Sequence, residues 1–167
     1  EGHPDDLNTK TYYGSSGWKE GLTLATEDCL TTSPTSCSNR KRWTWSDWDQ
    51  DDTGVSYQTN PRVIETRVGD DTNTKRTTIE YTENLVTGQV LYGLPKTVQV
   101  YDSSLSNVLK KVTTEYNLDS AYTSRRIIGL PSKTEAWGWN DLTSSLEYVS
   151  KVTYEYDYDD DFATSGL

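Results

Sequence analysis

Alternating carboxylates in DWDQDDTG, residues 47–54, have the spacing closest to that of a metal-binding loop in this chain. An EF-hand calcium loop needs glycine at its sixth position and a bidentate glutamate at its twelfth. These positions are Asp52 and Gln58, and the amide of Gln58 carries no charge. We therefore interpret this run, and the denser YDYDDD of residues 156–161, as solvated acidic turns that keep sheet edges unpaired. The sequence predicts no metal and no cofactor.

The sequence contains few of the residue arrangements that carry out catalysis. The single histidine, His3, lies beside Pro4 and Asp5, where no rigid element would hold a general base. The sequence has no phosphate-binding glycine loop, no Cys-x-x-Cys pair and no histidine cluster. Paired carboxylates serve glycoside hydrolysis when a cleft holds them, and the sequence indicates no cleft. We predict that the protein is not an enzyme.

Two tryptophan pairs at alternate positions are the candidate binding residues. Trp43 and Trp45, and likewise Trp137 and Trp139, would lie on one face of a strand, because successive side chains of a strand point to opposite faces. Flat aromatic faces in this arrangement can stack on the sugar rings of a cell-surface glycan. The alternative is cross-strand packing, which we favour because the chain has few aliphatic residues. A carbohydrate-binding β module is therefore the second functional hypothesis.

The two cysteines, Cys29 and Cys37, flank the proline-containing loop DCLTTSPTSC. The short span lets the sulfur atoms meet, so we predict a disulfide, with two reduced thiols in a flexible loop as the alternative. A disulfide indicates an oxidising compartment, and hence a secreted or cell-surface protein.

Charge and hydropathy argue against several partners. The formal net charge of -10 disfavours nucleic acid, because affinity for phosphates needs clustered Lys and Arg, and the basic run at residues 40–42 is short. No apolar stretch approaches the roughly 18 residues of a membrane span, and no signal peptide is recognisable, so we expect no membrane insertion. Because the chain contains no methionine, we expect a mature secreted protein or a piece of a longer one.

A period close to 36 residues runs through most of the chain. The segments TTIEY, VTTEY and VTYEY end on tyrosines 35 and 40 residues apart, and a step of 36 back from the first reaches a tryptophan: Trp45, Tyr81, Tyr116 and Tyr156. Prolines share the period, at Pro61, Pro95 and Pro131, and Gly93 and Gly129 begin Gly-Leu-Pro in two copies. Glycine permits positive φ and proline is tolerated as the first residue of a strand, so Gly-Leu-Pro predicts a turn before a strand.

Alternation of side chains within each copy predicts strands, with Val112, Thr114 and Tyr116 on one face. The segments DSSLSN and NDLTSS are typical of hairpin connections. Because one hairpin cannot bury its apolar face, successive hairpins must join into a continuous sheet. We predict an all-β fold of repeated antiparallel hairpins in a curved sheet. Residues 1–40 would form a divergent, loop-rich unit with the cysteine loop, and residues 41–167 about three to four repeats.

An aromatic residue followed by Asp or Asn recurs at the expected strand ends, in Tyr101-Asp102, Tyr116-Asn117, Trp139-Asn140 and Tyr156-Asp157. Together with Gly-Leu-Pro and phrases such as YTSRRIIGLPSKTEAW, this pattern over residues 41–161 resembles the bacterial Rhs/YD-repeat family. The resemblance implies a β-sheet that winds into a hollow shell, as in the shells of toxin complexes and in teneurins. This chain is too short for a complete shell, and it lacks the Asp-Pro dipeptide of the motif that closes Rhs shells.

The leading functional hypothesis is accordingly an extracellular, non-enzymatic structural module. It would be an arc of a YD-type shell, or a subunit of a fibre or adhesive surface. Its last strand would expose backbone groups that can pair with a neighbour. We therefore expect self-association, or pairing with neighbouring repeats of a longer parent protein, with Tyr154 and Tyr156 at the assembly edge.

Overall fold

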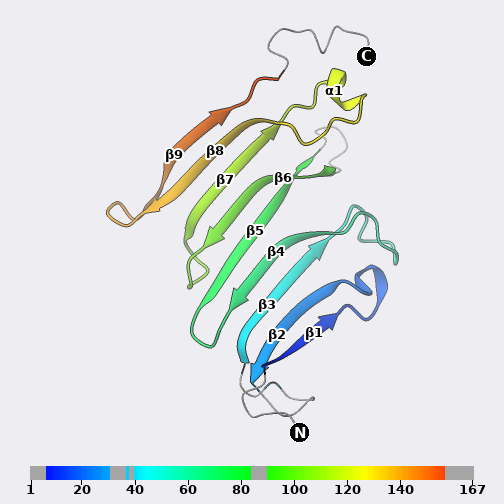
Figure 1. The fold of residues 1–167 in the computed structure, drawn as a ribbon, viewed down its shortest axis with the longest axis vertical. Helices are drawn as coiled ribbons and strands as arrows, with labels where there is room; N and C mark the ends of the chain where they lie inside the picture. Colours follow the sequence, from blue (N-terminus) through cyan, green and yellow to red (C-terminus); the bar gives the residue numbers. More distant parts are fainter. Residues whose placement is uncertain (1–6, 31–36, 38–39, 84–89, 157–167) are drawn as a thin grey trace. The chain divides into compact units, whose positions relative to one another are not determined.

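The computed structural model describes residues 7–30, 37, 40–83 and 90–156. Its elements are β1 (Leu7–Tyr13), η1 (Gly17–Lys19), β2 (Thr23–Leu30), β3 (Arg40–Asp49), β4 (Arg62–Gly69), β5 (Thr74–Glu83), β6 (Val90–Tyr101), β7 (Val108–Tyr116), α1 (Ser120–Thr123), β8 (Pro131–Asn140) and β9 (Ser145–Thr153). The nine strands form one antiparallel sheet in the order of the sequence (Figure 1). The predicted all-β fold of antiparallel hairpins is confirmed.

The chain divides into two compact units. The first comprises Glu1–Ile79 and Val100–Val108, and the second comprises Glu80–Gln99 and Leu109–Leu167. Strands β1 to β4 lie wholly in the first unit, whereas β8, β9 and α1 lie wholly in the second. The side-chain clusters discussed below each belong to one unit.

Few side chains of the described residues are buried. The buried apolar ones are Cys29 and Tyr122, and the buried polar ones are Gln50 and Thr97. Strand residues are mostly half-buried instead, as at every position of β4 and β8. Thr, Tyr, Trp and Val suit this setting because they fit a pleated, partly exposed surface. Long side chains therefore pack beside one another across the strands rather than in a buried aliphatic layer.

Aspartate and asparagine side chains close the hairpin turns. The Asp70 carboxylate accepts two backbone N–H groups in the β4–β5 turn, both at 2.8 Å. The Asp102 carboxylate accepts two in the β6–β7 turn at 3.1 and 3.3 Å, and the Asn140 side-chain oxygen accepts one after β8 at 2.9 Å. In such Asx turns a short polar side chain takes the place of a backbone acceptor. In Tyr101-Asp102 and Trp139-Asn140, the polar residue is thus a turn residue.

The two Gly-Leu-Pro segments occupy different places in the sheet. Gly129 has a φ of 82° and precedes Pro131, the first residue of β8, as predicted. Gly93 also has a positive φ, 65°, but it lies with Pro95 inside β6, so the prediction of a turn between strands is wrong for this copy. The residues VLY before Gly93 favour an extended conformation and continue the strand on that side. The residues before Gly129 instead follow a short helix.

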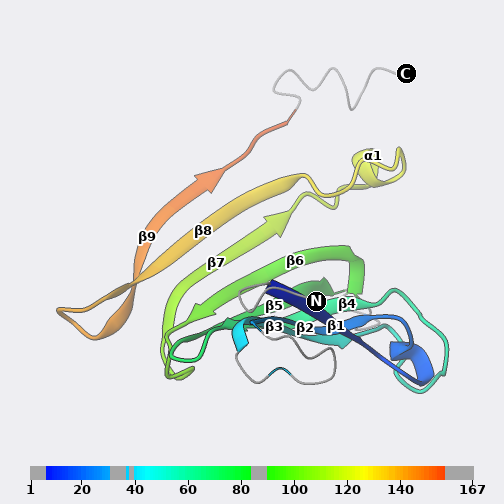
Figure 2. The ribbon, with the colours of Figure 1, turned by 60° about the horizontal axis from the view of Figure 1, so that its bottom comes forward.

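That helix, α1, occupies the connection from β7 to β8 and was not predicted. Both views place it between the end of β7 and the start of β8 (Figures 1 and 2). The Asp119 carboxylate caps its first turn by accepting the Ala121 N–H at 2.8 Å. Tyr122, in the same turn, is only 9% exposed. A single capped turn is too short to produce a helical period in the sequence.

Acid should weaken the β6–β7 turn through Asp102. Hydrogen bonds from the Ser104 hydroxyl, then from Asn107 and backbone N–H groups, hold the pKa of Asp102 at about 2, below its usual 3.8. A carboxylate with a depressed pKa stabilises the folded state above the usual pKa, and this contribution disappears as the pH falls from about 4 toward 2. We expect Asp102→Ala to lower the melting temperature at neutral pH and to flatten its dependence on pH in that range.

Circular dichroism at several pH values measures both effects. Asp141→Ala is the control, because Asp141 is an exposed aspartate in the next hairpin turn. The control should follow the wild-type profile. Superimposable profiles for wild type and Asp102→Ala would show that the turn does not depend on the carboxylate.

Candidate functional site

The repeat tyrosines make the same hydrogen bond in two successive hairpins. The Tyr116 hydroxyl, at the end of β7, donates to the carbonyl oxygen of Pro95 in β6 at 2.9 Å. The Tyr156 hydroxyl donates to the carbonyl oxygen of Pro131, where β8 begins, at 2.9 Å. We call these the tyrosine–proline bonds. In each hairpin, the bond joins the two strands at the end far from the Asx turn. The bonds thus link the repeated tyrosines to the repeated prolines, which share one period in the sequence.

Loss of one tyrosine–proline bond should lower stability without unfolding the chain. Tyr156→Phe removes only the hydroxyl, so we expect the free energy of unfolding to fall by about 1 kcal/mol. Tyr116→Phe should have a similar effect. Tyr57→Phe is the control, because that side chain is 66% exposed in a loop. Urea denaturation measures the free energy of unfolding of each variant. If Tyr156→Phe and Tyr116→Phe were both as stable as Tyr57→Phe, the tyrosine–proline bonds would not contribute to stability.

Strands β2, β3 and β4 place tryptophan and arginine side chains together in the first unit. Cross-strand register puts Trp45 beside Arg67, and Trp43 beside Gly69. The two indoles line one hollow, as the alternation of side chains along a strand predicts. We call it the Trp43–Trp45 hollow. Its volume is about 420 Å³, and it is lined by Ala25, Glu27, Arg40, Trp43, Thr44, Trp45 and Arg67.

An arginine lies over each indole of the hollow. The Arg40 guanidinium lies 5.3 Å from the ring centre of Trp43, and the Arg67 guanidinium lies 5.3 Å from that of Trp45. Attraction between a cation and an aromatic face at this distance contributes about 0.5–1 kcal/mol at exposed sites. The side chains of Arg40 and Arg67 are still 41% and 40% exposed. A ligand in the hollow can therefore reach both guanidinium groups.

Three guanidinium groups share two carboxylates around the hollow. Arg40 pairs with Glu27 at 3.2 Å, while Arg67 and Arg76 both pair with Glu65, at 2.7 and 2.6 Å. Partial burial alone would raise the pKa of Glu65, but hydrogen bonds from Arg76 and Arg67 outweigh it and hold this pKa below its usual value. Three guanidinium groups against two carboxylates leave the cluster with one excess formal positive charge.

Gly69 allows the Trp43 ring to lie close to β4. A Cβ at Gly69 would come within 2.8 Å of Trp43 Cζ2 and within 2.7 Å of the Asn73 carbonyl oxygen. The Trp43 indole nitrogen is buried, and it has no hydrogen-bond partner in the described part of the chain. This contact cannot be predicted from the sequence, because it depends on the pairing register of β3 and β4.

The second tryptophan pair, in the second unit, packs against neighbouring strands. Trp137 lies opposite Tyr148 of β9, with ring centres 5.6 Å apart and planes at 78°. The Lys111 ammonium lies 5.3 Å from the Trp137 ring centre, and Trp139 lies opposite Leu146. Edge-to-face contacts of this kind stabilise aromatic pairs. The surroundings of Trp137 support cross-strand packing.

Ion pairs hold the acidic run of residues 47–54. Asp47 pairs with Lys19 at 3.3 Å, and Arg62 pairs with both Asp49 and Asp51, at 3.4 and 2.6 Å. Asp47 and Asp49 belong to strand β3, so the interpretation as acidic turns is wrong for these two residues. Asp51 is an exposed residue of the loop after β3, where it pairs with Arg62.

Gln50, within this run, organises the loop that follows β3. It is 3% exposed, its side-chain oxygen accepts the Thr59 N–H at 3.0 Å, and its amide donates to the carbonyl oxygen of Asp52. A buried amide with satisfied hydrogen bonds fixes the path of an irregular segment. Gln50 was missed in the sequence because a polar residue among aspartates gives no indication of burial.

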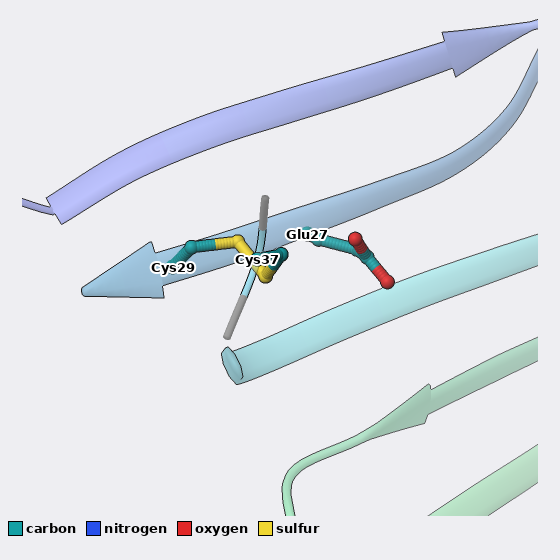
Figure 3. Close-up of side chains that lie close together, drawn as sticks. All are labelled: Glu27, Cys29 and Cys37. Carbon is teal, nitrogen blue, oxygen red and sulfur yellow. A yellow bond between two sulfur atoms is a disulfide. The ribbon is translucent and has the colours of Figure 1, made fainter. Parts of the chain in front are cut away.

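Cys29 and Cys37 form the predicted disulfide, with Cα atoms 5.5 Å apart and Cys29 fully buried (Figure 3). Glu27 lies beside it, and its carboxylate and the two sulfur atoms lie within 4.8 Å of one another. Sulfur atoms joined in a disulfide are not thiolates and do not bind a metal as such. This group is therefore no metal site in its oxidised form, and the disulfide is compatible with a secreted protein.

The remaining predicted residues are dispersed. His3 and Asp157 lie outside the described residues, Tyr81 lies in β5, and the Arg76 guanidinium lies 4.7 Å from the Tyr101 ring centre. Tyr154 follows β9, is 41% exposed, and donates its backbone N–H to the Ser132 carbonyl at 3.0 Å. Across the described ranges, no helix is long and apolar enough to span a membrane.

Comparisons with known proteins find little similarity. No protein-family model matches the chain, and no curated protein matches it. The crystal structure of a protein of unknown function from Bacteroides fragilis aligns with a TM-score of 0.32 and 11% identity, covering 89% of this chain and 93% of that chain. Similarity at this level supports no conclusion about function.

Proposed function

We propose that the chain is an extracellular, non-enzymatic structural module of the Rhs/YD-repeat type, in which each hairpin extends one β-sheet. The observation that supports this proposal is the recurrence of one hairpin design. Two successive hairpins have an Asx turn at one end and a tyrosine–proline bond at the other. Because each hairpin contains its own stabilising contacts, further hairpins can be added at a sheet edge.

Strand β9 is the edge to which we assign assembly. It is last in the strand order, and its exposed apolar side chains include Tyr148, Val149 and Val152, at 53, 66 and 46% exposure. An edge strand presents backbone groups that can pair with a strand of the next repeat or of a second copy. The register with β8 shifts between Ala136 and Trp137, so β9 pairs regularly in two stretches, residues 145–148 and residues 150–153. The second stretch adjoins Tyr154, which the sequence predicts at the assembly edge, and we therefore assign pairing to residues 150–154.

Self-association should increase with salt. The net charge of -10 opposes association at low ionic strength, and salt screens that repulsion. We expect sedimentation velocity to show larger species as the salt rises from about 10 mM to about 500 mM, and electron microscopy to show filaments. Val152→Lys should suppress this association because a charge on an edge strand blocks pairing.

Leu142→Lys is the matched control for that experiment. Leu142 is 95% exposed in the β8–β9 turn and receives the same change of charge away from the proposed contact. The control should associate as the wild type does. A wild-type protein that stays monomeric at high concentration and high salt would contradict assembly through β9.

Carbohydrate binding is the second candidate function, and one observation favours it. Two half-buried indoles and two arginines line the Trp43–Trp45 hollow, whereas Trp137 is packed against Tyr148. Concave sites with aromatic walls and a few polar groups are typical of small-molecule binding. This candidate therefore rests on the first tryptophan pair alone.

A further inference from the structure

We propose that the Trp43–Trp45 hollow binds carboxylated sugars, specifically the hexuronic acid units of an acidic glycan. The proposal rests on the second candidate function, to which it gives a ligand class. It does not depend on the structural role proposed for the hairpins, because the hollow lies within the first unit and β9 within the second. The two functions can therefore fail separately.

The shape of the hollow suits a short run of sugar rings. Trp43 and Trp45 are separated by one residue of β3, which sets their Cα atoms about 6.7 Å apart. Each indole can pack on the apolar C–H face of one pyranose ring once the arginine that lies over it turns to the ligand. The volume of about 420 Å³ lies within the range of roughly 300–1,000 Å³ that is usual for small-ligand sites.

Charge selects an acid over a neutral sugar. Arg40 and Arg67 line the hollow, Arg76 lies opposite Arg67 on β5, and these three guanidinium groups pair with only two carboxylates. This local positive charge stands out in a chain with a net charge of -10. A planar guanidinium binds a carboxylate through two parallel hydrogen bonds, a geometry that an ammonium group cannot provide.

Both arginines can turn to a ligand without leaving a carboxylate unpaired. Glu27, the partner of Arg40, also accepts the Tyr12 hydroxyl at 2.8 Å. Glu65, the partner of Arg67, also accepts Arg76 at 2.6 Å. An arginine that turns away normally leaves its carboxylate without a hydrogen-bond partner, which costs free energy. That cost is reduced here, because each carboxylate keeps a second donor. An acidic peptide offers similar carboxylates but no regular row of apolar ring faces for the indoles, so we favour the glycan.

Titration of the whole chain with a tetrasaccharide of galacturonic acid tests the proposal, with tryptophan fluorescence and calorimetry as readouts. The same oligosaccharide with its carboxyl groups reduced to alcohols is the neutral probe, and an oligoglutamate of equal charge is the peptide probe. We expect saturable binding of the acidic sugar alone. Arg67→Gln should weaken it about tenfold, the effect of losing a charged hydrogen bond, and Arg67→Lys should recover only part of the loss.

Lys111→Gln is the matched control, because it removes the same charge from a cation over a tryptophan in the other unit. It should bind the acidic sugar as the wild type does. Trp45→Phe keeps an aromatic ring and is the variant to use if Trp45→Ala does not fold, and it should reduce the fluorescence response. Equal affinity for the neutral sugar or the oligoglutamate, or an equal loss in Lys111→Gln, would overturn the proposal. The salt-dependent sedimentation of the unliganded chain tests the structural role separately.

Discussion

Replacement of Gly14 by alanine should destabilise the first unit by about 3 kcal/mol, near the upper end of the usual cost of forcing extra atoms into a packed site. A Cβ at Gly14 would lie 1.9 Å from the backbone carbonyl oxygen of Lys19 and 2.6 Å from its carbon. Two backbone hydrogen bonds fix this approach, from Gly14 to Leu22 at 2.9 Å and from Gly21 to Gly14 at 3.0 Å. Because backbone atoms cannot rotate aside, the β1–β2 connection must open.

Urea denaturation and amide hydrogen exchange in β1 and β2 measure this effect. Gly138→Ala is the control: its Cβ would lie at an ordinary 3.4 Å from Val149 Cγ2, and the alanine stiffens a strand residue. We expect the control to be neutral or slightly stabilising. If the two variants were equally stable, the loop around Gly14 would be able to accommodate a Cβ by adopting a different backbone conformation.

Reduction of the Cys29–Cys37 disulfide should lower the free energy of unfolding by about 2.5 kcal/mol. The two cysteines are 8 residues apart, and closing a loop of that length restricts the unfolded chain by about this amount in the chain-entropy model. The loss should be largest in the first unit, where the bridge holds the end of β2. Cys29→Ala/Cys37→Ala should resemble the reduced wild type, with a further loss for the truncated, fully buried Cys29.

Intact mass before and after alkylation establishes the redox state on which this result depends. The oxidised protein should take up no alkylating reagent until a reductant is added. Denaturation with and without reductant then gives the energy, with the double variant as a control that reductant should not affect. Two thiols labelled without reductant would contradict both the bridge and the argument for an oxidising compartment.

The sequence predicts most of the fold because its signals are local. Side-chain alternation and turn residues define the hairpins, and the spacing of Tyr116 and Tyr156, 40 residues, is close to the 36 residues between Pro95 and Pro131. The tyrosine–proline bonds themselves were not predicted, because a hydroxyl reaches a carbonyl only once strand register is fixed. Two copies of Gly-Leu-Pro also behave differently, since the residues before each glycine decide whether the strand continues.

Only part of the candidate site can be predicted from the sequence, because the rest depends on strand register. The alternation of Trp43 and Trp45 along one strand predicts a shared face. Arg67 comes from β4, and its place beside Trp45 depends on the register of β3 and β4. That register shifts between Asp47 and Trp48, and no local sequence pattern indicates a shift of this kind. The pairing of residues across strands therefore cannot be predicted from local sequence patterns.

The hairpin design has a consequence for how such a chain can change length during evolution. An Asx turn and a tyrosine–proline bond both lie inside one hairpin, so neither is broken when a whole hairpin is duplicated or deleted beside it. Gene duplication in steps of one hairpin would then preserve every such contact in the copies that remain. Insertion of a single residue inside a strand would instead move the side chains that follow it to the opposite face. Selection would therefore tolerate gain or loss of entire repeats far better than small insertions within them.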